Sequence, residues 1–319
     1  MEQAPFHHDV SRGPEGGAAY WLRTEDDLRI RISVWTSPDT QKGTVLLFPG
    51  RTEYAEKYGV TAAALAEHGY SSVAVDWRGQ GLADRLLPNR ATGHVLRFPD
   101  YQLDVAAVMA ALPSLSLPAP YNLIAHSMGG CIGLRSLMEG LAVDTATFSG
   151  PMWGIRLTPP LRPVAWGLST LSRPLRFGHI YPPGQGGETY VLRAPFEDNT
   201  LTSDAEMFDL LKEQLINHPD LALGGPSLHW LNEALREMRH LASRPSPDIP
   251  AIAFVGENER IVDKLRIKAR MDRWPRGRME VMERGEHELL VERAEIRSRI
   301  IDEAVEMIEN PPKALATVA

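Results

Sequence analysis

The sequence predicts an α/β fold with a mostly parallel central sheet, helices on both faces of the sheet and an inserted helical cap. Short apolar runs alternate with longer helical patterns up to residue 150 and again after residue 248. Such alternation is typical of a parallel sheet with crossover helices. Residues 151–247 hold prolines and helical patterns but no buried-strand pattern. We therefore expect a core of residues 1–150 and 248–319, with a helical cap of residues 151–247.

The composition of the 319-residue chain is that of an ordinary globular protein, with 43% hydrophobic and 24% charged residues. The formal net charge of −7 argues against nucleic acid as a partner. The single cysteine, Cys131, cannot form an intrachain disulfide or build a cysteine metal cluster. No apolar run approaches the ~20 residues of a membrane-spanning helix, and the first residues lack a signal-peptide core. We expect a cytoplasmic protein and leave peripheral contact with a membrane surface open; the sequence does not predict an oligomeric state.

The elements of the first half follow from the spacing of their apolar residues. Residues 1–20 are polar and glycine-rich, and we expect a loose lead-in there. The run at 44–48 is unbroken apolar sequence after Thr44, as expected of a strand that is covered on both faces. The predicted strands are 29–35, 44–48, 71–75, 122–126 and 145–149, and the predicted helices are 56–68, 100–112 and 131–139.

The second half begins with the predicted cap. One cap helix is expected to start at Ser203, with Glu206 completing a capping box and an apolar face formed by Met207, Leu210, Leu211 and Leu215. The α/β alternation then returns with a strand at 251–255, a helix to about residue 274, a strand at 279–282 and a helix at 294–308. The tail from Pro311 is expected to be disordered.

The stretch from Asn122 to Gly130 carries the strongest functional signal. Ser127 stands where the predicted strand turns into a helix, with Ala125 two residues before it and Gly129 two residues after it. Small residues at these positions allow the close backbone approach that a sharp strand-to-helix turn requires. Such a turn exposes the serine hydroxyl at the strand end. It also leaves the backbone N–H of Met128 free at a helix N-terminus, where it can stabilise an oxyanion.

Three further strand ends carry candidate catalytic groups, and the carboxyl ends of parallel strands meet at one edge of a sheet. Pro49 and Gly50 follow the strand at 44–48, so the Arg51 N–H is a candidate second oxyanion donor. Acidic residues follow the strand at 251–255. His287 follows the last strand, and it is the only one of the ten histidines in such a position. A serine nucleophile needs a base and an orienting carboxylate, and we expect His287 to be the base.

These residues resemble serine hydrolases of the α/β-hydrolase fold, and among them the lysophospholipase and monoacylglycerol lipase group. The resemblance covers about residues 20–310 and is weakest in the predicted cap. It rests on the motifs Phe48–Tyr54, Asp76–Gly81, Ala125–Gly130, Gly256–Val262 and Gly285–Glu288. It implies hydrolysis of a carboxylic ester of a lipid-like substrate, such as a lysophospholipid or monoacylglycerol, through an acyl-enzyme. No cofactor or metal is implied. The implied catalytic residues are Ser127, Glu259 and His287, with the N–H groups of Arg51 and Met128 as the oxyanion hole.

The sequence departs from the family pattern at three positions. Ala125 replaces a glycine, and Pro49 stands where many relatives carry histidine. Glu259 stands where aspartate is usual, which leaves Asp263, four residues later, as an alternative acid. Asp263 is also expected to begin the next helix, where a carboxylate is favoured as a cap. The loop after the strand at 145–149 offers no carboxylate up to Thr158.

Several alternatives for function stay open at this point. The same residues could act on another ester, a lactone or a peptide amide, or could transfer an acyl group, because a fold does not fix a substrate. A non-catalytic receptor is a third class, and the complete pair of Ser127 and His287 argues against it. The first half of the predicted cap is basic. This surface is either an ordinary solvated face or a site where some of its arginines meet a phosphate head group or an anionic membrane surface, and the sequence leaves both interpretations open. These arginines are Arg156, Arg162, Arg173, Arg176 and Arg193, against Glu188 alone.

Overall fold

The computed structural model describes residues 1–36, 39, 41–158 and 160–312. Within these residues the chain forms one nine-stranded sheet in the order β1-β2-β3-β5-β4-β6-β7-β8-β9. The six strands β5, β4, β6, β7, β8 and β9 pair with one another in parallel. The strands β1, β2 and β3 form an edge in which all pairs, including that of β3 with β5, are antiparallel. The strands are β1 Glu2–Ala4, β2 Ala18–Arg23, β3 Arg29–Trp35, β4 Thr44–Phe48, β5 Ser71–Asp76, β6 Tyr121–His126, β7 Ala146–Ser149, β8 Ala251–Gly256 and β9 Gly277–Met282.

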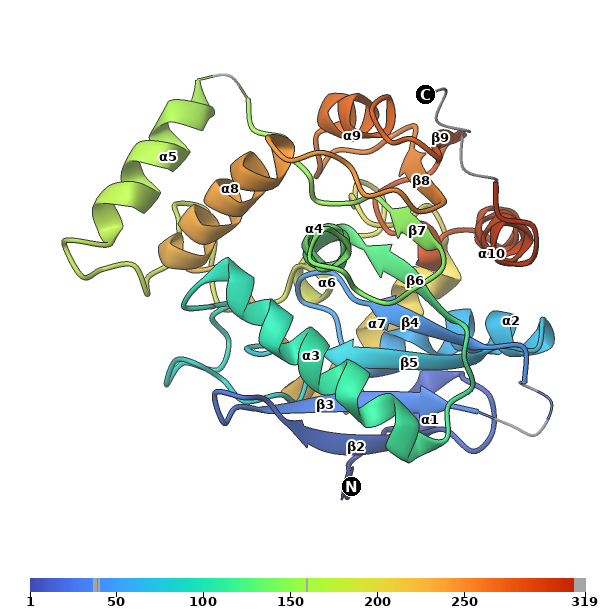
Figure 1. Ribbon diagram of the computed structural model, residues 1–319. Helices are drawn as coiled ribbons and strands as arrows, with labels where there is room; N and C mark the ends of the chain where they lie inside the picture. The colour runs from blue at the N-terminus through green and yellow to red at the C-terminus, as the bar shows by residue number, and fades with distance from the viewer. Residues whose placement is uncertain (37–38, 40, 159, 313–319) are drawn as a thin grey trace.

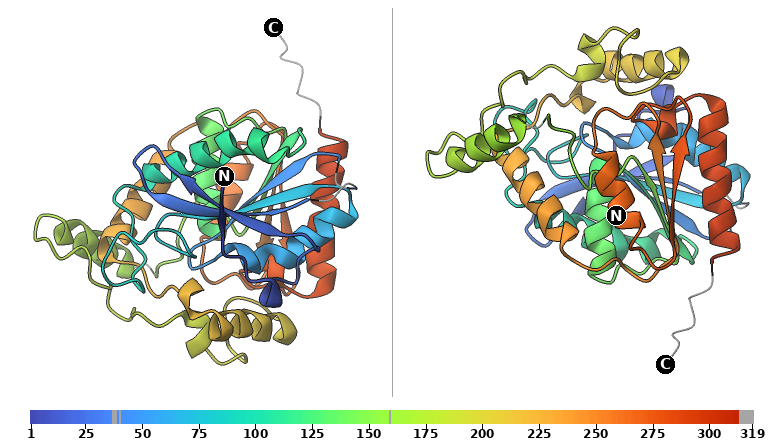
Figure 2. Two further views of the ribbon diagram at one scale, coloured as in Figure 1. Left: turned by 90° about the horizontal axis from the view of Figure 1, so that it is seen from below. Right: turned by 90° about the horizontal axis from the view of Figure 1, so that it is seen from above.

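Helices cover both faces of this sheet (Figures 1 and 2). On one face α3, Tyr101–Ala111, α4, Ser127–Met138, and α9, Lys264–Met271, pack on the side chains of one apolar cluster. On the other face α2, Gly59–Glu67, and α10, Ala294–Glu309, enclose a second cluster. Short 3₁₀ helices occur at Ala55–Tyr58, Phe98–Asp100, Leu112–Leu115, Pro219–Leu221 and Leu289–Val291. The predicted mostly parallel sheet with two covered faces is confirmed.

The prediction of a loose N-terminal lead-in is wrong. Residues 1–20 contain β1, the short helix α1 at His8–Ser11 and the start of β2, and β2 pairs with β3 over its whole length. Gln214 on a distant helix donates a hydrogen bond to the Val10 carbonyl oxygen (2.9 Å), so tertiary contacts fix this segment. The predicted disordered tail from Pro311 lies, from residue 313 on, outside the described residues.

In the described residues between β7 and β8 the chain forms four α-helices, namely α5 Leu161–Ser172, α6 Tyr190–Arg193, α7 Ala205–Asn217 and α8 Leu228–Ala242. In the described part of this stretch there is no strand beyond two isolated bridges, at Ile155 and Pro226. α8 packs against the core of the sheet through five apolar side chains: Trp230, Ala234, Leu235, Met238 and Leu241. α5 lies on the outer side of α8 and forms an outer edge of the molecule (Figure 1). The division at residues 151 and 247 into core and cap stays a prediction.

The predicted N-cap of α7 is wrong by one residue. The cap is Asp204, whose carboxylate accepts a hydrogen bond from the Met207 N–H, while the Ser203 hydroxyl donates to Glu292 instead. Both Ser203 and Asp204 are good N-cap residues, and a tertiary partner decides between them. Among the described residues, no helix combines the length and the apolarity needed to cross a bilayer.

Candidate active site

The turn between β6 and α4 has the geometry that presents a side chain at the top of the sheet. Ser127 takes a positive φ of 47°, which is a strained conformation for a residue other than glycine. Gly129 lies against the backbone of Phe48 at the end of β4, and a Cβ there would overlap the Phe48 carbonyl oxygen. The close packing of α4 on β4 therefore explains why the residue two positions after Ser127 is a glycine.

The structure brings together Ser127, His287 and Glu259, three residues from separate parts of the chain. His287 Nε2 lies 2.9 Å from Ser127 Oγ, and His287 Nδ1 lies 2.6 Å from Glu259 Oε2. All three side chains are buried. This chain of hydrogen bonds is the arrangement in which an imidazole can take a proton from a hydroxyl while a carboxylate fixes its tautomer.

The Glu259 carboxylate is held by its own loop as well as by His287. Its other oxygen, Oε1, accepts the backbone N–H groups of Ile261 (2.6 Å) and Val262 (3.0 Å). Burial disfavours the charged form, but the charge of His287 and these hydrogen bonds outweigh it, and the pKa of Glu259 is lowered. The carboxylate is therefore ionised at neutral pH and can orient the imidazole.

Asp263, the alternative acid, has other partners. Its side chain caps α9 by accepting the Leu265 N–H at 3.1 Å. The same carboxylate lies 3.3 Å from the Arg162 guanidinium and 3.7 Å from that of Arg266. The structure thus gives Asp263 the capping position expected from its place before a helix.

The loop after β4 lies beside Ser127. A Cβ placed on Gly50 would be 3.1 Å from the Ser127 Cβ, so a side chain there would crowd Ser127. Among the described residues, the backbone N–H groups of Arg51 and Met128 have no protein acceptor. Both groups are therefore available to a bound oxyanion.

Residues of the Asp76–Gly81 motif hold this loop in place. Trp77 Nε1 donates to the Pro49 carbonyl oxygen at 2.9 Å, and Gln80 Nε2 donates to the Gly50 carbonyl oxygen at 2.7 Å. Because the Trp77 and Gln80 side chains bind both carbonyl groups, the peptide units of the loop keep their orientation. The sequence motif contained these two residues, but their spacing gave no indication of this role.

A buried network of charges lies behind the three residues, and sequence reasoning missed it. Lys57 Nζ contacts Glu53 and lies 2.6 Å from Glu288 Oε2, and His126 Nε2 lies 3.2 Å from the same Glu288 oxygen. Glu53 in turn accepts the Gly50 N–H and the Tyr58 hydroxyl (2.7 Å). Burial opposes each charge, but the opposite charges outweigh it, so the pKa of Lys57 is raised and that of Glu288 is well below its usual range.

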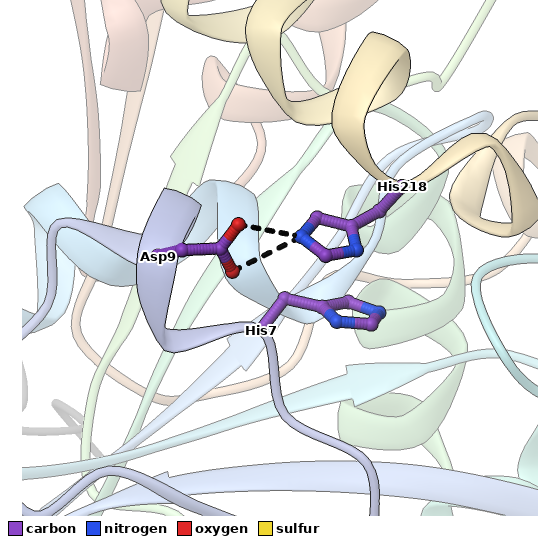
Figure 3. A group of neighbouring side chains, drawn as sticks. All are labelled: His7, Asp9 and His218. Carbon is purple, nitrogen blue, oxygen red and sulfur yellow. Dashed lines mark hydrogen bonds and ion pairs between the residues drawn. The ribbon is translucent and has the colours of Figure 1, made fainter.

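Two groups of side chains in the described residues have the composition of a metal site. In the first, Glu53, His126 and Glu288, the Lys57 ammonium already lies between the carboxylates. The second is drawn in Figure 3, where the Asp9 carboxylate faces His218 Nε2 at 2.9 Å and the His7 ring stacks on the His218 ring.

The His7 and His218 ring centroids are 3.6 Å apart with an interplanar angle of 19°. Nitrogen lone pairs lie in the ring plane, so stacked imidazoles direct them side by side rather than toward one ion. We interpret this group as an ion pair and a stack that fasten α1 to the end of α7.

The family comparison supports the chemistry that this geometry suggests. A family model described as serine aminopeptidase, S33, matches residues 39–294, which include all three residues and the loop after β4. The chain belongs to this serine hydrolase family. The match spans most of the chain, including the helices between β7 and β8.

Curated relatives agree with the family match. The chain is 30% identical to lysophospholipase L2 of Escherichia coli strain K12 over 286 residues, which cover 86% of this chain and 82% of that protein. It is 29% identical to a probable lysophospholipase L2 of Haemophilus influenzae over 259 residues, covering 81% and 80% of the two chains. The predicted resemblance to the lysophospholipase and monoacylglycerol lipase group is confirmed.

Solved structures agree on the fold. A soluble variant of monoglyceride lipase from Saccharomyces cerevisiae superposes with a TM-score of 0.71 at 18% identity, over 96% of this chain and 98% of that one. A thermostable carboxyl esterase from Bacillus coagulans gives a TM-score of 0.73 at 14% identity, over 93% and 99%. The predicted α/β-hydrolase fold is therefore confirmed.

Proposed function

We propose that this member of the serine aminopeptidase S33 family hydrolyses carboxylic esters of lipid-like substrates, lysophospholipids or monoacylglycerols, through an acyl-serine intermediate. The observation that carries this proposal is the hydrogen-bonded chain from Ser127 Oγ through His287 to Glu259. The lysophospholipase names of the curated relatives and the monoglyceride lipase among the structural neighbours support the lipid-like substrate.

In the first step, Ser127 Oγ attacks the ester carbonyl carbon, and its proton passes to His287 Nε2. The carbonyl π electrons move to the oxygen, and the N–H groups of Arg51 and Met128 stabilise the resulting oxyanion. When the tetrahedral intermediate collapses, the bond to the alkoxy oxygen breaks. The leaving alcohol takes the proton from His287, and the acyl group stays on Ser127.

In the second step, water takes the place of the alcohol. His287 accepts a proton from the water, whose oxygen attacks the acyl-serine carbonyl carbon, and the same two N–H groups stabilise the second oxyanion. Collapse of this intermediate returns the proton to Ser127 Oγ and releases the carboxylic acid. Glu259 keeps Nε2 of the neutral imidazole free to accept a proton and stabilises the imidazolium when it forms.

The test is covalent labelling with a fluorophosphonate probe, followed by turnover of matched esters. Wild-type protein should be labelled and should hydrolyse lysophosphatidylcholine or monoacylglycerol, and Ser127→Ala should do neither while its circular dichroism spectrum is unchanged. Labelling of Ser127→Ala at the wild-type rate would remove Ser127 from the role of nucleophile. If the wild-type protein is labelled but hydrolyses none of the lipid esters, Ser127 remains the proposed nucleophile and the proposed substrate class is wrong.

Hydrolysis of a peptide amide is the second candidate, because the matching family model is described as an aminopeptidase. Binding of a substrate ammonium requires a free carboxylate near the nucleophile. Among the described residues, two carboxylates behind Ser127, those of Glu53 and Glu288, already bind Lys57. Aminoacyl anilides beside esters of equal size in the panel distinguish the two candidates, and we expect turnover of the esters.

We further propose that α5 contacts a membrane surface. Leu161, Val164 and Leu171 are exposed, although a helix of a globular protein normally buries its apolar side chains. The two buried residues of α5 are polar, Ser169 and Ser172. Two more apolar side chains are exposed beyond the helix, Leu175 and Ile180. An apolar face of this kind, directed outward, is the feature of helices that lie in the interfacial layer of a bilayer.

Of the five arginines in this stretch, Arg156 donates to the Glu259 carbonyl oxygen at 3.3 Å, and the other four divide into two groups. Arg162 and Arg173 pair with Asp263 (3.3 Å) and Glu233 (2.7 Å). Arg176 and Arg193 are exposed, and in the described part of the chain neither has a carboxylate partner. A cation near an anionic bilayer surface contributes about 1 kcal/mol to binding, so the two exposed arginines favour anionic lipid.

Vesicle co-sedimentation tests this contact. We expect more wild-type protein on vesicles of phosphatidylcholine with phosphatidylglycerol than on phosphatidylcholine alone. The double variant Leu171→Ser and Leu175→Ser should bind several-fold less. Leu265→Ser, which removes a still more exposed leucine from α9, is the control. Equal loss in the control, or no loss in the α5 variant, would contradict the proposal.

A further inference from the structure

The Arg51 side chain is a cation without a counter-charge. Its Nη1 donates one hydrogen bond, to the Gly224 carbonyl oxygen at 2.8 Å, and its guanidinium carbon lies 5.8 Å from the centre of the Trp230 ring. Within the described residues it forms no ion pair with a carboxylate. The side chain is only partly exposed, and burial lowers the pKa of the Arg51 guanidinium to about 10.

Other enclosed arginines of this protein are compensated more fully. Arg31 contacts Glu56 and Asp76, and Arg78 contacts Asp26 and Asp104. Two further arginines lack a carboxylate, but each donates to three protein acceptors: Arg85 and Arg270. Arg51 donates to one acceptor, although a guanidinium carries five N–H donors. Most of its hydrogen-bonding capacity is therefore available to a ligand.

The nearest backbone segments to the Arg51 guanidinium carry glycines. Gly93 lies next to it, and a Cβ on that glycine would be 3.5 Å from Arg51 Nη1. The Gly93 N–H donates to the Gly225 carbonyl oxygen at 3.0 Å, so the segment around Gly224 is fixed against the loop that carries Gly93. The guanidinium thus lies between two backbone segments that present glycines rather than side chains.

The position of Arg51 along the chain relates its side chain to the reacting ester. Its backbone N–H is one of the two proposed oxyanion donors, so its Cα lies beside the ester carbonyl. About six covalent bonds separate this nitrogen from the guanidinium carbon, and about six separate the carbonyl carbon of a lysophospholipid from its phosphorus. A substrate bound with its carbonyl at the N–H can therefore reach the guanidinium with its phosphate.

We propose that the Arg51 guanidinium binds the phosphate of a lysophospholipid substrate and selects it over a neutral monoacylglycerol. The proposal rests on the proposed ester hydrolysis at Ser127. A planar guanidinium can give a phosphate two parallel hydrogen bonds, and these charge-assisted bonds strengthen where water is excluded. The phosphate would supply the counter-charge that the fold withholds from Arg51.

Two substitutions separate this role from a purely structural one. Arg51→Gln keeps a donor for the Gly224 carbonyl oxygen and removes the charge, and Arg51→Lys keeps the charge and removes the planar fork. The measurement is the ratio of kcat/KM for palmitoyl lysophosphatidylcholine to that for monopalmitoylglycerol in the same mixed micelles. We expect the ratio to fall at least about tenfold in Arg51→Gln, mainly through KM, and less in Arg51→Lys.

The control is Arg85→Gln, which removes another partly buried arginine that donates only to carbonyl oxygens. Its substrate ratio should equal that of the wild type. As a second readout, glycerol 3-phosphate should inhibit hydrolysis of p-nitrophenyl butyrate by the wild type, and at least about tenfold more weakly in Arg51→Gln.

Equal losses of kcat/KM on both lipids in Arg51→Gln would overturn the phosphate site and leave Arg51 as a link to the Gly224 segment. Such a result would not affect the proposed esterase chemistry. Failure of that chemistry appears instead as absent fluorophosphonate labelling in the wild type.

Discussion

The imidazole rings of His126 and His287 lie 4.8 Å apart, centroid to centroid, and are directed to different partners. His287 Nε2 reaches Ser127 Oγ, whereas His126 Nε2 lies 3.2 Å from Glu288 and its Nδ1 lies 2.9 Å from the Ser149 carbonyl oxygen. His126 and Glu288 are the sequence neighbours of Ser127 and His287. The two histidines thus take part in separate chains of contacts, one through Ser127 and one through buried charges.

This arrangement predicts unequal effects of the two histidines. His287→Ala removes the proposed base and should lower kcat by up to about 10⁶, as far as loss of the serine does in a comparable triad. His126→Asn leaves the base in place and should lower kcat much less. Both variants are compared on one soluble ester, with fluorophosphonate labelling as a check. A larger loss in His126→Asn would exchange the roles of the two residues.

The stability of the protein should depend on pH through His126. Burial opposes its positive charge, but Glu288 and Glu53 outweigh burial and the repulsion by Lys57, so the pKa of His126 is raised. A raised pKa means that the folded state binds the proton more tightly than the unfolded state. The resulting stabilisation is complete below the ordinary histidine value of about 6.5 and is lost as the pH rises through the raised pKa.

We therefore expect the difference in free energy of unfolding between wild type and His126→Asn to be largest below about pH 6. It should decrease from about pH 6.5 upward. Urea unfolding of both proteins across this range measures the difference. A difference that grows with pH would contradict the raised pKa.

Much of the fold could be predicted because strand and helix patterns are local. The strand at 44–48 is apolar at four of its five positions, with Thr44 the exception, and is buried at every position. The site could be predicted in part because parallel strands place their carboxyl ends at one edge of the sheet, which relates Ser127 to His287 across 160 residues. The motif at Gly256 then indicated Glu259 rather than Asp263.

What the sequence could not indicate depends on tertiary pairing. β1 has three residues, too few for a periodic pattern, and it forms only because β2 offers an edge. Lys57, Glu53 and Glu288 look like ordinary surface residues in sequence, and their burial follows from the packing of two segments that are far apart in the chain. The sequence had no signal for this network apart from the unusual density of charges next to two motifs.

The buried network should also position the loop that carries Arg51, one of the two proposed oxyanion donors. Glu53 accepts the Gly50 N–H and a Tyr58 hydroxyl, and Glu53→Gln would weaken both contacts and leave Lys57 with one carboxylate. Loss of one oxyanion donor costs about 10²–10³ in kcat, and we expect a displaced loop to cost up to about 10². Breaking a buried ion pair should also lower the free energy of unfolding by about 3 kcal/mol.

The control is Glu206→Gln on α7, which removes the exposed ion-pair partner of Arg12. It should change neither kcat nor the free energy of unfolding measurably. Ester turnover and urea unfolding of both variants check the prediction. If Glu53→Gln loses stability but keeps the wild-type kcat, the network supports the fold without positioning the loop.

The identity of the acid gives the last prediction. Glu259 Oε2 lies 2.6 Å from His287 Nδ1, and the N–H groups of Ile261 and Val262 hold its other oxygen, so the longer side chain reaches the imidazole from a fixed loop. Glu259→Gln keeps the shape but replaces an acceptor by an amide that can stabilise the wrong tautomer. A comparable substitution in a serine protease triad costs about 10⁴ in kcat, and we expect a loss of that order here.

Asp263→Asn is the matched control, because it removes one carboxylate from the same loop. Asparagine caps a helix as well as aspartate does, so the Leu265 N–H keeps its acceptor and the free energy of unfolding should change by less than about 1 kcal/mol. Since the Asp263 carboxylate contacts arginines and the α9 terminus rather than the imidazole, kcat should stay within a few-fold of the wild type. Turnover of both variants on one ester decides between the two acids. A large loss of kcat in Asp263→Asn with a mild loss in Glu259→Gln would contradict the assignment of Glu259. The loop would then have to rearrange during catalysis so that Asp263 replaces Glu259 at His287 Nδ1.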